Sequence, residues 1–196
     1  GATEKLQRSS RSGRGDFAGV TTDGNFITAW SLVLDPGETI HLKARAIGRQ
    51  RNGTDRTTRE LSAGAYRAPA DLTFDLASGT ITVGSIVTGA TSGASARIVA
   101  SSQTGVGGTL SLRDIVGTFE VGETLSTSAG ETAKCTSPLS SPSTTVVGLA
   151  DIGTIYESDS AWDFTVDASA SQVRVKVKGA TSKTVEWSVQ IDVMRP

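Results

Sequence analysis

The sequence predicts an all-β protein: an antiparallel β-sandwich, jelly-roll-like, with an inserted small Gly/Thr/Ser-rich β-barrel-like domain and a flexible N-terminal arm. Three observations predict this class. Gly occurs 22 times, and Ser and Thr together make up about a quarter of the chain; these residues favour turns and pleated strands. Several segments alternate apolar and polar residues at a period of two. Strong helix formers never gather into a helical face.

Composition limits the function classes. The chain has 196 residues, a net charge of -1 and 5% aromatic residues, so we expect no attraction to nucleic acid or to an anionic membrane. One cysteine, Cys135, and one histidine, His41, leave no disulfide and no His/Cys metal cluster. We expect no cofactor, no leader peptide and no membrane span, because no apolar run approaches the required length of about 18 residues.

The first element is an arm over residues 1–24. It lacks apolar periodicity and carries four basic residues, Lys5, Arg8, Arg11 and Arg14. Such a segment is either a flexible, solvated terminus or an interaction arm that becomes ordered against a neighbouring subunit.

The sandwich is expected to begin with residues 25–70. Trp30, Leu32 and Leu34 share one face of a strand, and the alternation resumes at 40–46, where His41 lies on the opposite, basic face. Asn52-Gly53 indicates a type I′ hairpin turn, because both residues tolerate positive φ. The returning strand is expected over 60–66.

The inserted domain is expected over residues 71–138, where nearly every residue is small or β-branched. It contains a degenerate repeat with a period of about 38 residues: 81–84 followed by 93–98, then 119–122 followed by 130–135. Each half predicts strands separated by Gly turns. Together with a strand at 107–112, they predict a unit of five or six strands.

The sandwich is expected to resume over residues 139–196, after a Pro- and Ser-rich linker at 138–143. Alternation at 173–177 and at 185–193, separated by a turn at 179–183, predicts a hairpin. Its basic and acidic outer faces are expected to pair across the strands. Trp30, Trp162 and Trp187 fall at inward positions and are expected in the core, the alternative being an exposed platform for glycan stacking.

Catalytic motifs are absent from the sequence, so we do not expect an enzyme. Cys135 is expected to be a buried small hydrophobe. Glu157, Asp159 and Asp163 are spaced like oxygen ligands and form a weak candidate Ca²⁺ site, against the simpler interpretation of solvated loop carboxylates. Tyr66 and Tyr156 are the candidate glycan contacts.

Short phrases of the chain resemble β modules of tailed-bacteriophage virion proteins. Residues 83–96 (VGSIVTGATSGASA) and 117–125 (GTFEVGETL) look like the Gly/Thr/Ser-rich modules of these proteins. Residues 39–49, 155–163 and 179–187 are similar to a module of phage tail and fibre components. These patterns cover most of the chain after the arm, and they transfer no catalytic residue.

The resemblance implies a structural subunit on the exterior of a phage virion: a fibre, spike, tail or capsid-decoration protein. Its partners would be other virion proteins and further copies of itself, with a trimer as the usual form of fibres and spikes. The basic residues of the arm would supply docking contacts. The alternative is a carbohydrate-binding module or adhesin that recognises a host cell-surface glycan. A depolymerase is the third hypothesis, ranked below the other two because such enzymes need paired carboxylates in a groove.

Overall fold

The computed structural model describes residues 13–196, with side chains from residue 15 onward except at 154 and 155. The described residues form antiparallel strands and no helix, so the all-β prediction is confirmed. None of them forms a helix with the length and apolar character that spanning a bilayer requires. The chain divides into two compact units. The large unit comprises the residues up to Leu34, Thr39–Tyr66 and Thr144–Pro196, and the barrel unit comprises Asp35–Glu38 and Arg67–Ser143.

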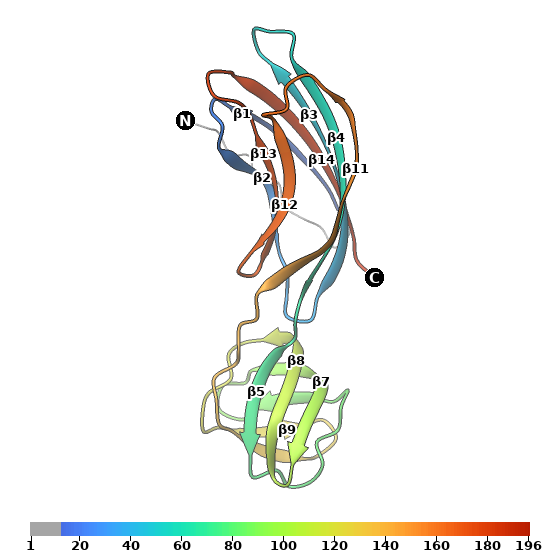
Figure 1. The fold of residues 1–196 in the computed structure, drawn as a ribbon. Helices are drawn as coiled ribbons and strands as arrows, with labels where there is room; N and C mark the ends of the chain where they lie inside the picture. The colour runs from blue at the N-terminus through green and yellow to red at the C-terminus, as the bar shows by residue number, and fades with distance from the viewer. Residues whose placement is uncertain (1–12) are drawn as a thin grey trace. The chain divides into compact units, whose positions relative to one another are not determined.

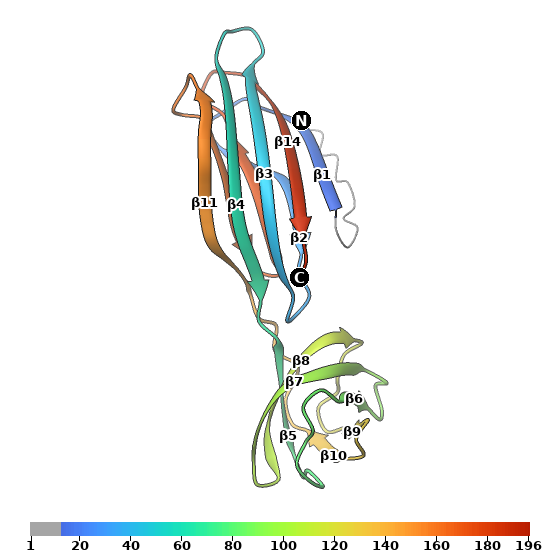
Figure 2. The same cartoon turned by 90° about the vertical axis from the view of Figure 1, so that its right-hand side faces the viewer.

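The large unit contains two antiparallel sheets (Figures 1 and 2). The five-stranded sheet has the order β1 (Gly13–Thr21), β14 (Val185–Met194), β3 (Thr39–Gln50), β4 (Arg56–Arg67) and β11 (Thr144–Glu157). The three-stranded sheet has the order β12 (Asp163–Ser169), β13 (Gln172–Lys178) and β2 (Phe26–Val33). Inward residues of both sheets form a single buried cluster, so each sheet covers the apolar face of the other.

Three tryptophans lie at the centre of this core, as the alternation predicts. Trp30, Trp162 and Trp187 are all buried. The rings of Trp162 and Trp187 meet edge to face, with centroids 6.0 Å apart. The indole Nε1 of Trp187 donates a hydrogen bond to the hydroxyl of Thr21 at 3.0 Å, which links the last strand to the first.

The hairpin expected between 173–177 and 185–193 is wrong. β13 pairs with β12 and β2, whereas β14 lies in the other sheet between β1 and β3. Alternation identifies both strands correctly, but two inward faces that meet across a core have the same period as two strands that pair side by side. The charges pair accordingly: Arg174 with Asp167 on β12, and Glu186 with arginines of the β3 hairpin.

The arm expected over residues 1–24 overlaps a strand. Residues 13–21 form β1, whose nine residues all pair with β14. Periodicity did not reveal it, because its inward positions include Gly15 and Gly19, and only Phe17 is a buried hydrophobe. Gly15 is required there by a close approach, since a Cβ would lie 2.9 Å from the Trp30 ring nitrogen. The first twelve residues lie outside the described part of the chain.

The β3–β4 hairpin occurs where the sequence predicts it, but with a different turn. Gln50 donates its amide hydrogen to the carbonyl of Asp55 at 3.0 Å, so five residues form the loop. Neither Asn52 nor Gly53 adopts the positive φ that a type I′ turn requires.

The barrel unit is a closed six-stranded barrel. Around it, the strands follow the order β10 (Thr132–Cys135), β5 (Ala70–Asp75), β8 (Gly107–Val116), β7 (Ser95–Thr104), β6 (Ile86–Gly89) and β9 (Thr124–Thr127). A separate buried cluster fills it. The expected linker at 138–143 belongs to this unit, because the Ser140 amide bonds to the carbonyl of Asp71 and the Arg67 guanidinium to that of Pro142, both at 2.8 Å.

The predicted repeat corresponds to a local two-fold relation in the barrel. β6 and β9 pair with Thr88 opposite Ser126, two positions that are 38 residues apart. The bond from the Ala90 amide to the Thr124 carbonyl, 2.9 Å, has its counterpart 38 residues on in the bond from Ser128 to Ile86, 2.8 Å. The segments at 81–84 and 119–122 are turns rather than strands. They end in Gly84 (φ 93°) and Gly122 (φ 90°).

One buried carboxylate breaks this symmetry. Glu123 accepts hydrogen bonds from the backbone amides of Thr91, Ser92 and Glu120 and from the Ser92 hydroxyl, at 2.7–3.1 Å. Burial raises the pKa of this carboxyl, but these hydrogen bonds outweigh burial, and the pKa lies below its ordinary value. Gly89 makes room for the carboxylate.

We expect Gly48→Ala to destabilise the large unit by about 1–3 kcal/mol, because the added methyl overpacks the core. Its Cβ would lie 2.8 Å from the Trp187 ring and 2.9 Å from the Thr57 methyl group. Urea unfolding followed by tryptophan fluorescence measures the change. Gly24→Ala is the matched control, since its nearest neighbour would be 3.4 Å away. Equal midpoints for both variants would contradict this account.

Barrel stability should fall with acidification because the pKa of Glu123 is lower in the folded state than in the unfolded chain. Its contribution is fully present above the ordinary pKa of 4.5, and is lost as the pH falls through the folded pKa. Hydrogen exchange measures this through the protection factors of the Thr91, Ser92 and Glu120 amides. Glu123→Gln should lower protection at pH 7 and reduce its pH dependence. A deficit that is the same at pH 7 and pH 3 would contradict the assignment.

Candidate functional site

The outward side chains of β14, β3 and β4 form the outer face of the five-stranded sheet. Strand register arranges them in rows across the sheet. The central rows are Ser188, Ile47 and Thr58; then Gln190, Arg45 and Glu60; then Asp192, Lys43 and Ser62; then Met194, His41 and Gly64. Inward and outward side chains alternate along each strand, so the residues between the core positions are the ones that make up this outer face.

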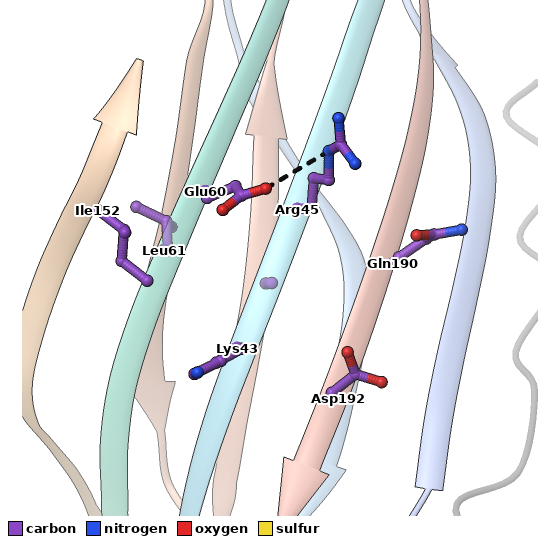
Figure 3. A pocket seen from close by; sticks show the side chains of 8 residues that line it. Lys43, Arg45, Glu60, Leu61, Ile152, Gln190 and Asp192 are labelled. Atoms are coloured by element: carbon purple, nitrogen blue, oxygen red, sulfur yellow. Dashed lines mark ion pairs between the residues drawn. The ribbon is translucent and has the colours of Figure 1, made fainter. Parts of the chain in front are cut away.

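A shallow depression of about 190 Å³ lies on the outer face. Its lining consists of Lys43, Ala44 and Arg45 from β3, Glu60 and Leu61 from β4, Ile152 from β11, and Gln190 and Asp192 from β14. Figure 3 shows the charged side chains of three neighbouring strands standing on the same face, with Ile152 beside them.

The charges in the depression are balanced. Arg45 and Glu60 form an ion pair at 3.6 Å between side chains that are about half and two-fifths exposed. Lys43 and Asp192 lie opposite each other in the register, and within the part of the chain that the structure describes neither forms an ion pair. A cation and an anion are therefore left available on one surface.

Large apolar side chains are exposed on the five-stranded sheet, and one of them, Ile152, lines the depression. They include Ile47, Tyr66, Val147, Ile152 and Met194, each between 40% and 54% exposed. Val147 of the edge strand β11 lies over Gly64, where a Cβ would be 3.2 Å from its methyl group. Exposed apolar groups rimmed by polar groups are typical of an interaction surface, which makes this face the candidate site.

His41 lies on the same face, as expected for the polar side of β3. It is half-buried, and its Nε2 is 2.9 Å from the Ser62 hydroxyl. Among the described residues no carboxylate is bonded to the ring, and its Nδ1 is buried without a hydrogen-bond partner, so the group that orients a general base beside a serine is missing there.

Two of the three carboxylates of the weak Ca²⁺ candidate bind cations of the chain instead. Asp159 accepts from Lys183 at 2.7 Å, which holds the pKa of this carboxyl below its ordinary value. Asp163 accepts from Arg59 at 2.8 Å. Glu157 is half-buried at the end of β11. The described residues contain no group of three or more His, Cys, Asp or Glu side chains that could hold a metal ion.

Arg59 forms two ion pairs that the sequence did not predict. It occupies an inward position of β4, in line with Leu61 and Ala63, and its side chain is 17% exposed. It binds Asp151 at 3.1 Å and Asp163 at 2.8 Å. Burial lowers the pKa of its guanidinium, but these partners outweigh burial and raise it. The sequence pattern that could have revealed these pairs is an arginine at an apolar position of an alternating strand, because a buried guanidinium requires carboxylate partners.

The two candidate glycan contacts are exposed but do not share one platform. Tyr66 is 40% and Tyr156 56% exposed. Tyr66 ends β4, near the row where Val147 contacts Gly64. Tyr156 lies at the other end of the β4–β11 pair, where the Ser158 amide bonds to the carbonyl of Arg56 at 3.0 Å.

The predicted interaction arm lies mostly outside the described residues. Lys5, Arg8 and Arg11 belong to the part of the chain that is not described, and Arg14 belongs to β1, opposite Asp192 in the register. Cys135 is buried in the barrel, where burial raises the pKa of its thiol.

Comparisons of this chain with protein-family models, with curated protein sequences and with solved structures find no match.

We expect millimolar Ca²⁺, and equally a chelator, to leave the melting temperature unchanged, because two of the three candidate carboxylates are bound to cations of the chain. Lys183→Met is the sensitivity control. It removes the ammonium that Asp55 and Asp159 share, and we expect the melting temperature to fall. A melting temperature that rises with Ca²⁺ would reinstate the metal site.

Proposed function

We propose that this chain is a structural subunit of a phage virion, exterior in the particle, which acts by associating with copies of itself and with other virion proteins. The observation that carries the proposal is the outer face, where exposed apolar side chains share one sheet with a charge-balanced depression. The virion class rests on the resemblance of the Gly/Thr/Ser-rich segments. A fibre, spike, tail or capsid-decoration role is compatible with both.

The architecture supports this proposal in two ways. The ion pair of Arg174 with Asp167 joins the neighbouring strands β13 and β12, and that of Arg59 with Asp163 joins the two sheets, which suits a rigid part. The large unit pairs its first strand with its last, β1 with β14, and β2 with the penultimate β13. Nested pairing of this kind supports the jelly-roll-like description that we propose for it.

A second candidate function is recognition of a host cell-surface glycan. The observation that favours it is the depression itself, where Glu60, Arg45, Gln190 and Asp192 present planar polar groups of the kind that hydrogen-bond to sugar hydroxyls. The three tryptophans are buried, and the exposed aromatic residues of the described chain are Tyr66, Tyr156 and Phe26. Lysine ammonium groups already lie over the Phe26 ring, so the two tyrosines are the candidates for stacking.

Neutralising the arm should reduce incorporation into particles several-fold if its basic residues dock the subunit. The variant carries Lys5→Ala, Arg8→Ala and Arg11→Ala, which leaves all nine residues of β1 in place. Quantitative mass spectrometry of purified particles measures incorporation. Lys134→Ala, an exposed charge of the barrel unit, is the control. Unchanged incorporation of the triple variant would remove the arm from the proposal, and absence of the wild-type chain from particles would reject the virion assignment.

A glycan array separates the two candidate functions. A structural subunit should give no saccharide binding. Saturable binding that Asp192→Ala weakens by tenfold or more, with an unchanged melting temperature, would favour the glycan candidate instead.

A further inference from the structure

We propose that two copies of this chain associate face to face through the outer face, about a two-fold axis that runs along the strands between β3 and β14. Lys43 of each copy then meets Asp192 of the other. The inference rests on the proposed structural function, because it names the surface through which copies would assemble. It replaces the trimer implied by the resemblance with a pair.

The charges of the depression indicate a second copy as the occupant. Arg45 and Glu60 pair within the chain at 3.6 Å. Lys43 and Asp192 are exposed, and among the described residues they have no ion-pair partner. A surface left with one cation and one anion is complementary to itself, whereas an acidic or a basic partner would satisfy only one of the two groups.

Strand register fixes the symmetry of the pair. Lys43 on β3 and Asp192 on β14 are direct neighbours in the ladder. A two-fold axis between these strands exchanges them, so the contact between Lys43 and Asp192 is made twice, as an isologous interface requires. The same axis places Ile47 over Ser188, and His41 over Met194, of the other copy. The large Ile47 side chain thus faces a small one, and Met194 makes an apolar contact with the His41 ring, between sheets about 10 Å apart.

The apolar groups distinguish this face from that of the other sheet. Ile47, Tyr66, Val147, Ile152 and Met194 are exposed on or beside it, and burying them would supply the apolar contact of an interface. The three-stranded sheet has fewer exposed apolar side chains, Phe26 and Val33 at the two ends of β2. The ammonium groups of Lys176 and Lys178 lie 5.0 and 5.5 Å from the centroid of the Phe26 ring.

Light scattering on a sizing column, over a range of concentrations, tests the proposal with the full chain. The wild type should approach twice 20.2 kDa. Lys43→Asp and Asp192→Lys should each raise the dissociation constant at least about tenfold, because each sets like charges together at two points. The double exchange, Lys43→Asp with Asp192→Lys, should restore the constant to within about threefold of wild type.

Lys134→Asp, the same charge change on the barrel unit, is the control and should leave the mass unchanged. Melting temperatures of the variants distinguish lost association from lost folding. A wild type that stays monomeric, a mass of three chains, or association that survives Lys43→Asp would each overturn the proposed pair. Particle incorporation is measured separately, so a monomer that still enters particles would reject this interface and leave the virion function standing.

Discussion

The large unit depends on the position of its last strand. β14 lies between β1 and β3, and its inward side chains Val185, Trp187, Val189 and Ile191 are all buried. Through the bond from Trp187 to Thr21 and the contact of Trp187 with Trp162, this strand connects both sheets and both ends of the described chain. Its outward side chains, Gln190 and Asp192, complete the depression. One strand therefore fixes the core on one side and the candidate interface on the other.

Alternation predicted which residues lie inside, but not which strands pair. The inward sets of β3, β13 and β14 and all three tryptophans were predicted correctly, because a period of two is a property of the strand itself. The change of sheet between β13 and β14 was not, since pairing depends on contacts between residues that lie far apart in the sequence. β1 was missed because glycines replace two of its inward hydrophobes, Gly15 beneath Trp30 and Gly19 beside the Phe17 ring.

The candidate site was predictable only in part. His41 and its basic neighbours were assigned to the outward side of β3, and the structure places them there. The depression could not be predicted, because Glu60, Ile152 and Asp192 join Lys43 only once four strands align. Likewise, Asp163 was assigned to a metal when its partner is Arg59, a residue over a hundred positions earlier. Opposite charges that meet through the fold leave no local pattern.

The closure of the barrel has a consequence for the order of folding. In the sequence, the inserted barrel unit, from Arg67 to Ser143, separates β4 from β11, which are neighbours in one sheet. As a flexible loop, that segment would impose an entropic cost on their pairing. The barrel closes on itself, and the bond between Arg67 and Pro142 holds its entry and exit together. Once the barrel has formed, the end of β4 and the start of β11 are already neighbours. The folded insert therefore lowers the entropic cost of pairing these two strands.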